Sequence, residues 1–122
     1  MPQILIIEDE KVLGEMYKEK FEAEGFQAFL VFSSEEAIET LKEIKPDLIL
    51  LDILLPRENG IQFLKRIKEI PGVSQILVVA FSNYDVPSAK QEALESGAMD
   101  YLIKTDYTPA QLIKKIKEYL SK

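Results

Sequence analysis

Four of the short apolar segments in this chain end in side chains that can do chemistry. These side chains are Glu8 with Asp9, Asp52, Ser82 and Lys104. Carboxylates bind divalent cations, and an aspartate can also attack phosphorus to form an aspartyl phosphate. A hydroxyl and an ammonium group can hold the oxygens of a phosphoryl group. The set therefore has the composition of a site for phosphoryl transfer assisted by a divalent cation.

Asp52 is the centre of this set. It follows residues 48–51, four apolar residues in a row that predict a strand buried on both faces. A carboxylate at the end of such a strand is costly to desolvate unless something pairs with it. Lys104 can neutralise it. The oxygens of Glu8, Asp9 and Asp52 suit Mg²⁺, because carboxylates that lie close together repel one another without a cation.

The elements that must position these side chains alternate between strand and helix. Apolar runs predict strands at 3–7, 27–32, 47–52, 75–81 and 101–103. Apolar spacing from Val12 to Phe21, two capping-box sequences (33–36 and 108–111) and several Gly and Pro breakers indicate the helices. The predicted helices cover about 12–24, 33–44, 61–70, 86–96 and 108–120.

This alternation predicts an α/β fold. Five strand–helix units form a doubly wound parallel sheet, with right-handed crossovers and helices on both faces. The carboxyl ends of parallel strands gather at one edge, so the acids, Ser82 and Lys104 should converge there. The 122 residues fit one domain, 1–122.

Composition narrows the function. A net charge of −6 argues against non-specific binding of nucleic acid. The chain has no cysteine, no run long enough to span a membrane and no signal-peptide pattern, so a cytoplasmic protein without membrane contact is expected. It also has no histidine, so any histidine that takes part in the chemistry must come from a partner.

Each residue also has a simpler interpretation. Glu8 and Asp9 could cap the first helix, and Asp52 could turn its loop or cap the next helix. Ser82 could be a loop hydroxyl, and Lys104 a solvated charge. The coincidence favours a site, because four of the five predicted strands end in a group that phosphoryl transfer can use.

The order and spacing of these residues resemble the receiver domain of two-component response regulators, in its single-domain, chemotaxis-type form. The shared motif is an acidic pair, an Asp with Pro at +4 and Gly at +8, a Ser or Thr, and a Lys. Here these are Glu8-Asp9, Asp52 with Pro56 and Gly60, Ser82, and Lys104. The stretch 97–104 is also similar to the family's approach to its lysine. The resemblance covers essentially the whole chain and implies a flavodoxin-like strand order 2-1-3-4-5.

The resemblance implies a role for each residue. Asp52 would accept a phosphoryl group from a phosphohistidine on a histidine kinase or a histidine phosphotransfer protein. Mg²⁺ would be held by Asp9, Asp52 and the main-chain carbonyl of Leu54, with Glu8 acting through water. Lys104 would hold a phosphoryl oxygen. The domain would thus catalyse its own phosphorylation and dephosphorylation without being a free-standing enzyme.

The resemblance also implies a switch. Ser82 would swing to hydrogen-bond the phosphoryl group, and Tyr101 would turn inward, changing the face made by the fourth helix, fifth strand and fifth helix. Without the family, Tyr101 would be a half-buried strand aromatic. The expected output is a downstream protein effector rather than direct nucleic-acid binding, and the resemblance allows a homodimer that forms on phosphorylation.

Several residues depart from the family pattern. Thr105 follows Lys104 where Pro is usual, and Asn83 follows Ser82 where Ala or Gly is common. Asn83 could narrow access to Asp52, and Phe81 could restrict the motion of Ser82. The bulky Leu54 and Tyr84 are expected to shield an acyl phosphate from water.

Two other functions compete with phosphorylation-switched signalling. A pseudo-receiver would keep the fold as an interaction module without being phosphorylated, which Asn83 and Thr105 leave open. A phosphatase or phosphotransferase with Asp52 as its nucleophile is the other. The best-known enzymes of that kind have a second Asp where this chain has Leu54, and they carry a cap domain.

Overall fold

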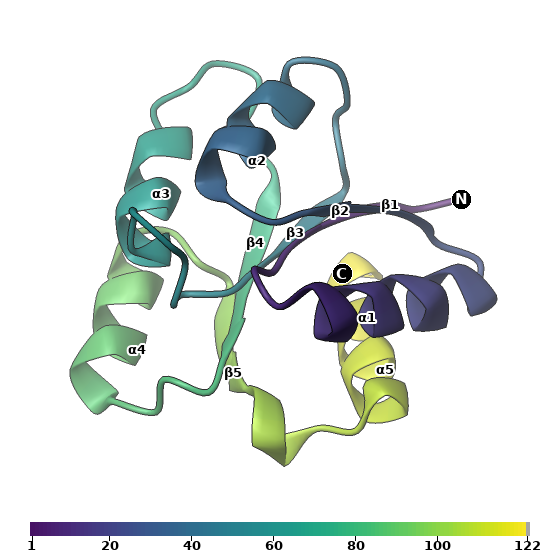
Figure 1. Ribbon diagram of the computed structural model, residues 1–122. Helices are drawn as coiled ribbons and strands as arrows, with labels where there is room; N and C mark the ends of the chain where they lie inside the picture. Colours follow the sequence, from purple (N-terminus) through teal and green to yellow (C-terminus); the bar gives the residue numbers. More distant parts are fainter. Residues whose placement is uncertain (122) are drawn as a thin grey trace.

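The apolar segments pair side by side in a computed structural model that describes residues 1–121 (Figure 1). Within these residues the sheet has five parallel strands in the order β2-β1-β3-β4-β5. The strands are β1 (Gln3–Ile7), β2 (Gln27–Val31), β3 (Leu48–Leu51), β4 (Leu77–Ser82) and β5 (Asp100–Ile103). The predicted fold class and the strand order implied by the resemblance are both confirmed.

Helices cover both faces of the sheet. They are α1 (Lys11–Ala23), α2 (Ser34–Leu41), α3 (Gly60–Ile67), α4 (Pro87–Glu95), the short 3₁₀ helix η1 (Lys104–Asp106) and α5 (Pro109–Leu120). Helices α1 and α5 pack on one face, and α2, α3 and α4 pack on the other, as Figure 1 shows.

The central strand β3 supplies side chains to both halves of the core. Ile49 and Leu51 lie in the cluster beneath α2, α3 and α4, whereas Leu48 and Leu50 lie in the cluster beneath α1 and α5. Successive side chains of a strand point to opposite faces, so a run of four apolar residues fits a strand that is covered on both sides. All four are at most 2% exposed.

The predicted helix signals are mostly confirmed. Thr108 and Gln111 form a complete capping box at α5. Ser33 caps α2 by accepting from the Glu36 N–H, but the Glu36 carboxylate accepts from the N–H of Phe32 instead of Ser33, so that box is only half formed. Gly25 has a φ of +93°, as expected just past the end of a helix.

Some element boundaries differ from the prediction. Helix α2 ends at Leu41 and α3 at Ile67, each about one turn early, and η1 was not predicted. Val12 is 84% exposed although its spacing placed it with the apolar face of α1. That helix buries Gly14, Tyr17 and Phe21, and a residue two positions before Gly14 points about 200° away from it.

None of the helices in the described part of the chain combines the length and apolar character that a membrane span requires.

Candidate functional site

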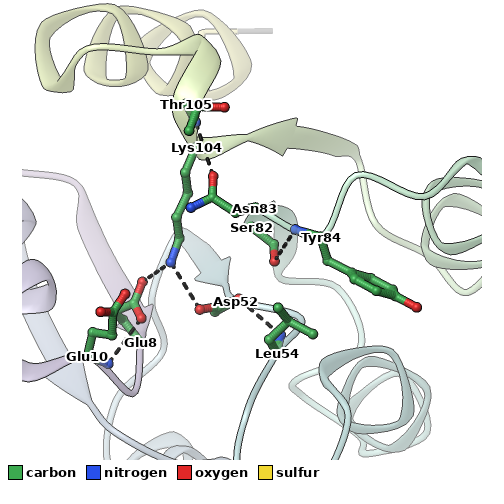
Figure 2. Close-up of polar contacts among 9 residues, drawn as sticks. All are labelled: Glu8, Glu10, Asp52, Leu54, Ser82, Asn83, Tyr84, Lys104 and Thr105. Atoms are coloured by element: carbon green, nitrogen blue, oxygen red, sulfur yellow. Dashed lines mark hydrogen bonds and ion pairs between the residues drawn. The ribbon is translucent and has the colours of Figure 1, made fainter.

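Four of the predicted site residues, Glu8, Asp52, Ser82 and Lys104, meet at the carboxyl edge of the sheet (Figure 2). Glu8 follows β1, Asp52 follows β3, Ser82 ends β4 and Lys104 follows β5. All four are buried, at 2%, 6%, 0% and 8% exposure, whereas Asp9 is exposed. The topology therefore brings together the groups that sequence spacing singled out, as parallel strands require.

Three carboxylates lie close enough to share a cation. One oxygen from each of Glu8, Asp9 and Asp52 lies within 4.8 Å of the others. Oxygen ligands from two buried acids and one exposed acid suit Mg²⁺, which favours carboxylates and keeps part of its water shell. The donor set therefore fits the predicted cation, although the Leu54 carbonyl as a ligand remains a prediction.

Lys104 joins two of these acids. Its Nζ lies 3.0 Å from Asp52 Oδ2 and also contacts the Glu8 carboxylate. It also lies 5.9 Å from the centre of the Phe81 ring. Burial alone would lower the pKa of Lys104, but the two carboxylates outweigh it and raise that pKa above its usual value. The side chain is thus a permanent cation, not the solvated charge of the simpler interpretation.

Glu8 belongs to this site rather than to the first helix. Within the described residues, Glu10 is the N-cap of α1 and makes no side-chain cap bond. Glu8 instead contacts Lys104 and accepts the main-chain N–H of Glu10 at 3.1 Å. Burial raises the pKa of Glu8 to about 7, and the nearby charge of Asp52 adds to this, while Lys104 opposes it. One ammonium group cannot neutralise two buried carboxylates, so burial favours a proton on Glu8.

Ser82 and Tyr101 both contact the main chain of Tyr84. Ser82 Oγ accepts from the Tyr84 N–H at 3.2 Å, and the Tyr101 hydroxyl donates to the Tyr84 carbonyl at 2.5 Å. Tyr101 is only 4% exposed, so it is not the half-buried aromatic of the simpler interpretation. Its side chain points inward.

An open cavity of about 230 Å³ gives access to Asp52. Its lining consists of Asp9, Glu10, Asp52, Leu54, Ser82, Asn83 and Lys104. Sequence reasoning did not place Glu10 here, and it did not predict that Asn83 Oδ1 accepts the main-chain N–H of Thr105 at 3.2 Å. The only available signal was the position of Asn83 and Thr105 immediately after two site residues.

The geometry agrees with comparison to known proteins. A family model described as the response regulator receiver domain matches residues 4–117. This chain belongs to the response regulator receiver domain family. The match covers the sheet from the second residue of β1 onward and includes Glu8, Asp52, Ser82 and Lys104 at its carboxyl edge.

Relatives of this receiver domain include a transcriptional regulatory protein. The phosphate regulon transcriptional regulatory protein PhoB of Escherichia coli is 37% identical over 115 residues, which are 94% of this chain and 50% of PhoB. The chain spans about half the length of the curated relatives it matches.

Solved structures agree with the fold of this receiver domain. A two-component response regulator from Clostridium difficile superposes with a TM-score of 0.92 at 31% identity, over 100% of this chain and 98% of that one. A CheY-like receiver domain protein from Methanospirillum hungatei has a TM-score of 0.91 at 25% identity, over 99% and 94% of the two chains.

Proposed function

We propose that this receiver domain accepts a phosphoryl group on Asp52 from a phosphohistidine of a histidine kinase or a histidine phosphotransfer protein. The observation that carries the proposal is the position of Asp52. It lies in an open cavity, with Lys104 at 3.0 Å and two further carboxylates close enough to share a cation.

In the proposed transfer, a carboxylate oxygen of Asp52 bonds to phosphorus while the bond from phosphorus to the donor's imidazole nitrogen breaks. The electron pair of that bond leaves with the nitrogen. Asp52 is already oriented, because its Oδ1 accepts the Leu54 N–H at 3.0 Å and its Oδ2 faces Lys104. The Lys104 ammonium group can move from Asp52 to a phosphoryl oxygen and stabilise its negative charge. Such electrostatic stabilisation is the main contribution to catalysis of phosphoryl transfer.

The same site is proposed to hold Mg²⁺ through Asp9, Asp52 and the Leu54 main-chain carbonyl, with Glu8 acting through water. When bound, the cation would supply positive charge that offsets repulsion between the carboxylates and the incoming phosphoryl group.

The proposed output is a change in the face made by α4, β5 and α5. Ser82 would give up the Tyr84 N–H as it swings toward a phosphoryl group, and the Tyr84 carbonyl accepts the hydroxyl of Tyr101 on β5. Tyr101 is buried in this structure, and phosphorylation would stabilise this packing. A downstream protein effector or a second copy of the chain would then bind that face.

Intact mass spectrometry after incubation with acetyl phosphate and Mg²⁺ tests the proposal. The wild-type chain should gain one labile phosphoryl group, and both Asp52→Asn and a chelator should abolish the gain. No gain in a chain that still binds Mg²⁺ would contradict the proposal and favour a pseudo-receiver. Turnover of a general phosphatase substrate would instead favour an Asp52-dependent phosphatase.

A further inference from the structure

Asn83 joins the two loops that carry Ser82 and Lys104. Its Oδ1 accepts the main-chain N–H of Thr105 at 3.2 Å, so the residue after Ser82 contacts the residue after Lys104. Thr105 lies in the 3₁₀ helix η1, whose own N-cap residue offers no side-chain cap within the described chain. Asn83 therefore satisfies a helix N–H that has no intrahelical partner.

This bond decides which way the Asn83 amide faces. A main-chain N–H can only donate, so the amide oxygen must face Thr105 and the NH₂ group must face away from it. Figure 2 draws the amide nitrogen of Asn83 on the side of the Lys104 side chain, opposite the Thr105 contact. Asn83 is exposed, and this nitrogen donates no hydrogen bond to any of the described residues 1–121.

Asn83, which carries this amide group, lines the cavity where a phosphoryl group would sit. Asn83 borders the opening of about 230 Å³ together with Asp52, Leu54 and Lys104. The other side-chain donors there are few, because two carboxylates share Lys104 and Ser82 has a single O–H, whose oxygen accepts the Tyr84 N–H. A phosphoryl group brings three oxygens, so it offers more acceptor sites than these two side chains can fill.

We propose that Asn83 is a further phosphoryl-binding residue, whose side-chain N–H donates to the group on Asp52 and to that group during its transfer. The Thr105 N–H holds the amide in the required orientation. The inference rests on the proposed phosphorylation of Asp52 and deepens it. A neutral donor aimed at charged oxygens makes a hydrogen bond about twice as strong as one between neutral groups.

Asn83 takes part in no covalent step. With acetyl phosphate, an Asp52 oxygen bonds to phosphorus while the bond from phosphorus to the bridging oxygen of the donor breaks, and the electron pair leaves with acetate. Asn83 keeps both of its amide protons throughout. Its N–H stabilises negative charge on the phosphoryl oxygens, where a donor placed in advance is most effective.

The competing explanation is that Asn83 only narrows the cavity, and two variants separate these explanations. Asn83→Ala removes both the bulk and the donor, whereas Asn83→Leu keeps a side chain of similar size without the donor. Loss of a donor predicts that both variants slow phosphorylation by acetyl phosphate about tenfold and weaken binding of beryllium fluoride, a phosphoryl mimic. If Asn83 only narrows the cavity, Asn83→Ala should be phosphorylated faster than wild type and Asn83→Leu at the wild-type rate.

Thr105 provides a second, independent pair of variants. Thr105→Pro removes the N–H that orients Asn83, and Thr105→Ala is the matched control that keeps it. Slower phosphorylation of the Pro variant alone would support the orienting bond. Amide hydrogen exchange in the metal-free chain gives a readout apart from activity, since the Thr105 amide should lose protection in Asn83→Ala and Asn83→Leu.

The outcomes distinguish this inference from the proposed function. Suppose that the wild-type chain is phosphorylated on Asp52. If Asn83→Ala and Asn83→Leu then react at the wild-type rate, or show the rates expected when Asn83 only narrows the cavity, the role of Asn83 is overturned and the proposed function stands. If the Thr105 amide stays protected in both variants, or Thr105→Pro reacts like Thr105→Ala, the orienting bond is overturned. If the wild-type chain takes up no phosphoryl group, both proposals are overturned.

Discussion

At Lys104, a single ammonium group faces two buried carboxylates. It pairs with Asp52 Oδ2 at 3.0 Å and with Glu8, and all three side chains are at least nine-tenths buried. Buried charges are tolerated only when they are paired and hydrogen-bonded, and removal of one partner destabilises the chain because it leaves the other charge buried and unpaired. The site therefore holds an excess negative charge, which a proton on Glu8 or a bound cation can offset.

Glu8→Gln should remove a pH-dependent loss of stability. Burial raises the Glu8 pKa from 4.5 to about 7, so the folded chain keeps a proton that the unfolded chain has released. The stability that this proton contributes is full below pH 4.5 and is lost as the pH rises through about 7.

Urea denaturation without divalent cations, at about pH 5 and about pH 8, checks this prediction. The wild-type chain should lose more unfolding free energy across the interval than Glu8→Gln does. The exposed residue Glu43, changed to Gln, is the control and should behave like wild type. Equal losses in wild type and Glu8→Gln would contradict the prediction.

Leu54→Asn should shorten the lifetime of an acyl phosphate on Asp52. Leu54 borders the cavity and is 52% exposed, so its side chain can shield the site from attacking water. The bond from its main-chain N–H to Asp52 does not depend on the side chain and should survive the change. The decay of the phosphorylated mass gives the lifetime.

Leu94→Asn is the matched control, because Leu94 is a similarly exposed leucine on α4 that does not border the cavity. Its acyl phosphate should decay like that of wild type. A Leu54→Asn lifetime equal to that of wild type would exclude the shielding role.

At the scale of elements, α3 begins where its first residue touches the loop that carries Asp52. A Cβ on Gly60 would lie 2.5 Å from the Asp52 carbonyl oxygen and 2.7 Å from Ile53 Cα. The Gly60 N–H also donates to the Ile53 carbonyl at 2.8 Å. Only a residue without a side chain lets the start of α3 pack this closely, and that contact positions the Asp52 loop.

Gly60→Ala should destabilise the chain by about 3 kcal/mol, because main-chain atoms rather than a flexible side chain would have to move. Gly25→Ala is the comparison, since a Cβ there meets nothing within 4 Å and only the φ of +93° opposes it. That change should cost about 1 kcal/mol. Urea denaturation measures both, and a Gly60→Ala cost no larger than that of Gly25→Ala would contradict the steric explanation.

At the scale of the whole molecule, the carboxylate cluster links separate parts of the chain. Glu8 and Asp9 follow β1, and Asp52 follows β3, the neighbouring strand in the sheet. A cation bound by these acids contacts the folded chain but has no comparable site in the unfolded chain. Mg²⁺ should therefore raise the free energy of unfolding, by about 2.7 kcal/mol when its concentration is one hundred times its Kd.

Removal of a ligand checks this prediction. Asp9→Asn should reduce or abolish the rise in thermal midpoint that Mg²⁺ causes in wild type, and chelation should reverse that rise. Asp106→Asn, in an acid outside the cluster, should leave the rise intact. The same Mg²⁺-dependent rise in Asp9→Asn and wild type would rule out Asp9 as a ligand.

Much of the fold follows from local pattern. The run 48–51 identifies a strand covered on both faces, and the alternation of strand and helix identifies a doubly wound sheet. Val12 shows where pattern fails, because apolar spacing alone does not say which stripe of α1 the sheet selects. The predicted ends of α2 and α3 are wrong for a similar reason, since helix ends depend on packing and turns as well as on propensity.

The amino-acid sequence therefore establishes which residues reach the carboxyl edge of the sheet, because parallel strands end at the same edge and four of the five end in a polar group that phosphoryl transfer can use. Tertiary structure alone decides how those residues pair. Lys104 is shared between Glu8 and Asp52, Tyr101 is buried against Tyr84, and Asn83 faces Thr105. These partners come from different loops, and their distances and orientations depend on the packing of the whole chain, which no local pattern of residues encodes.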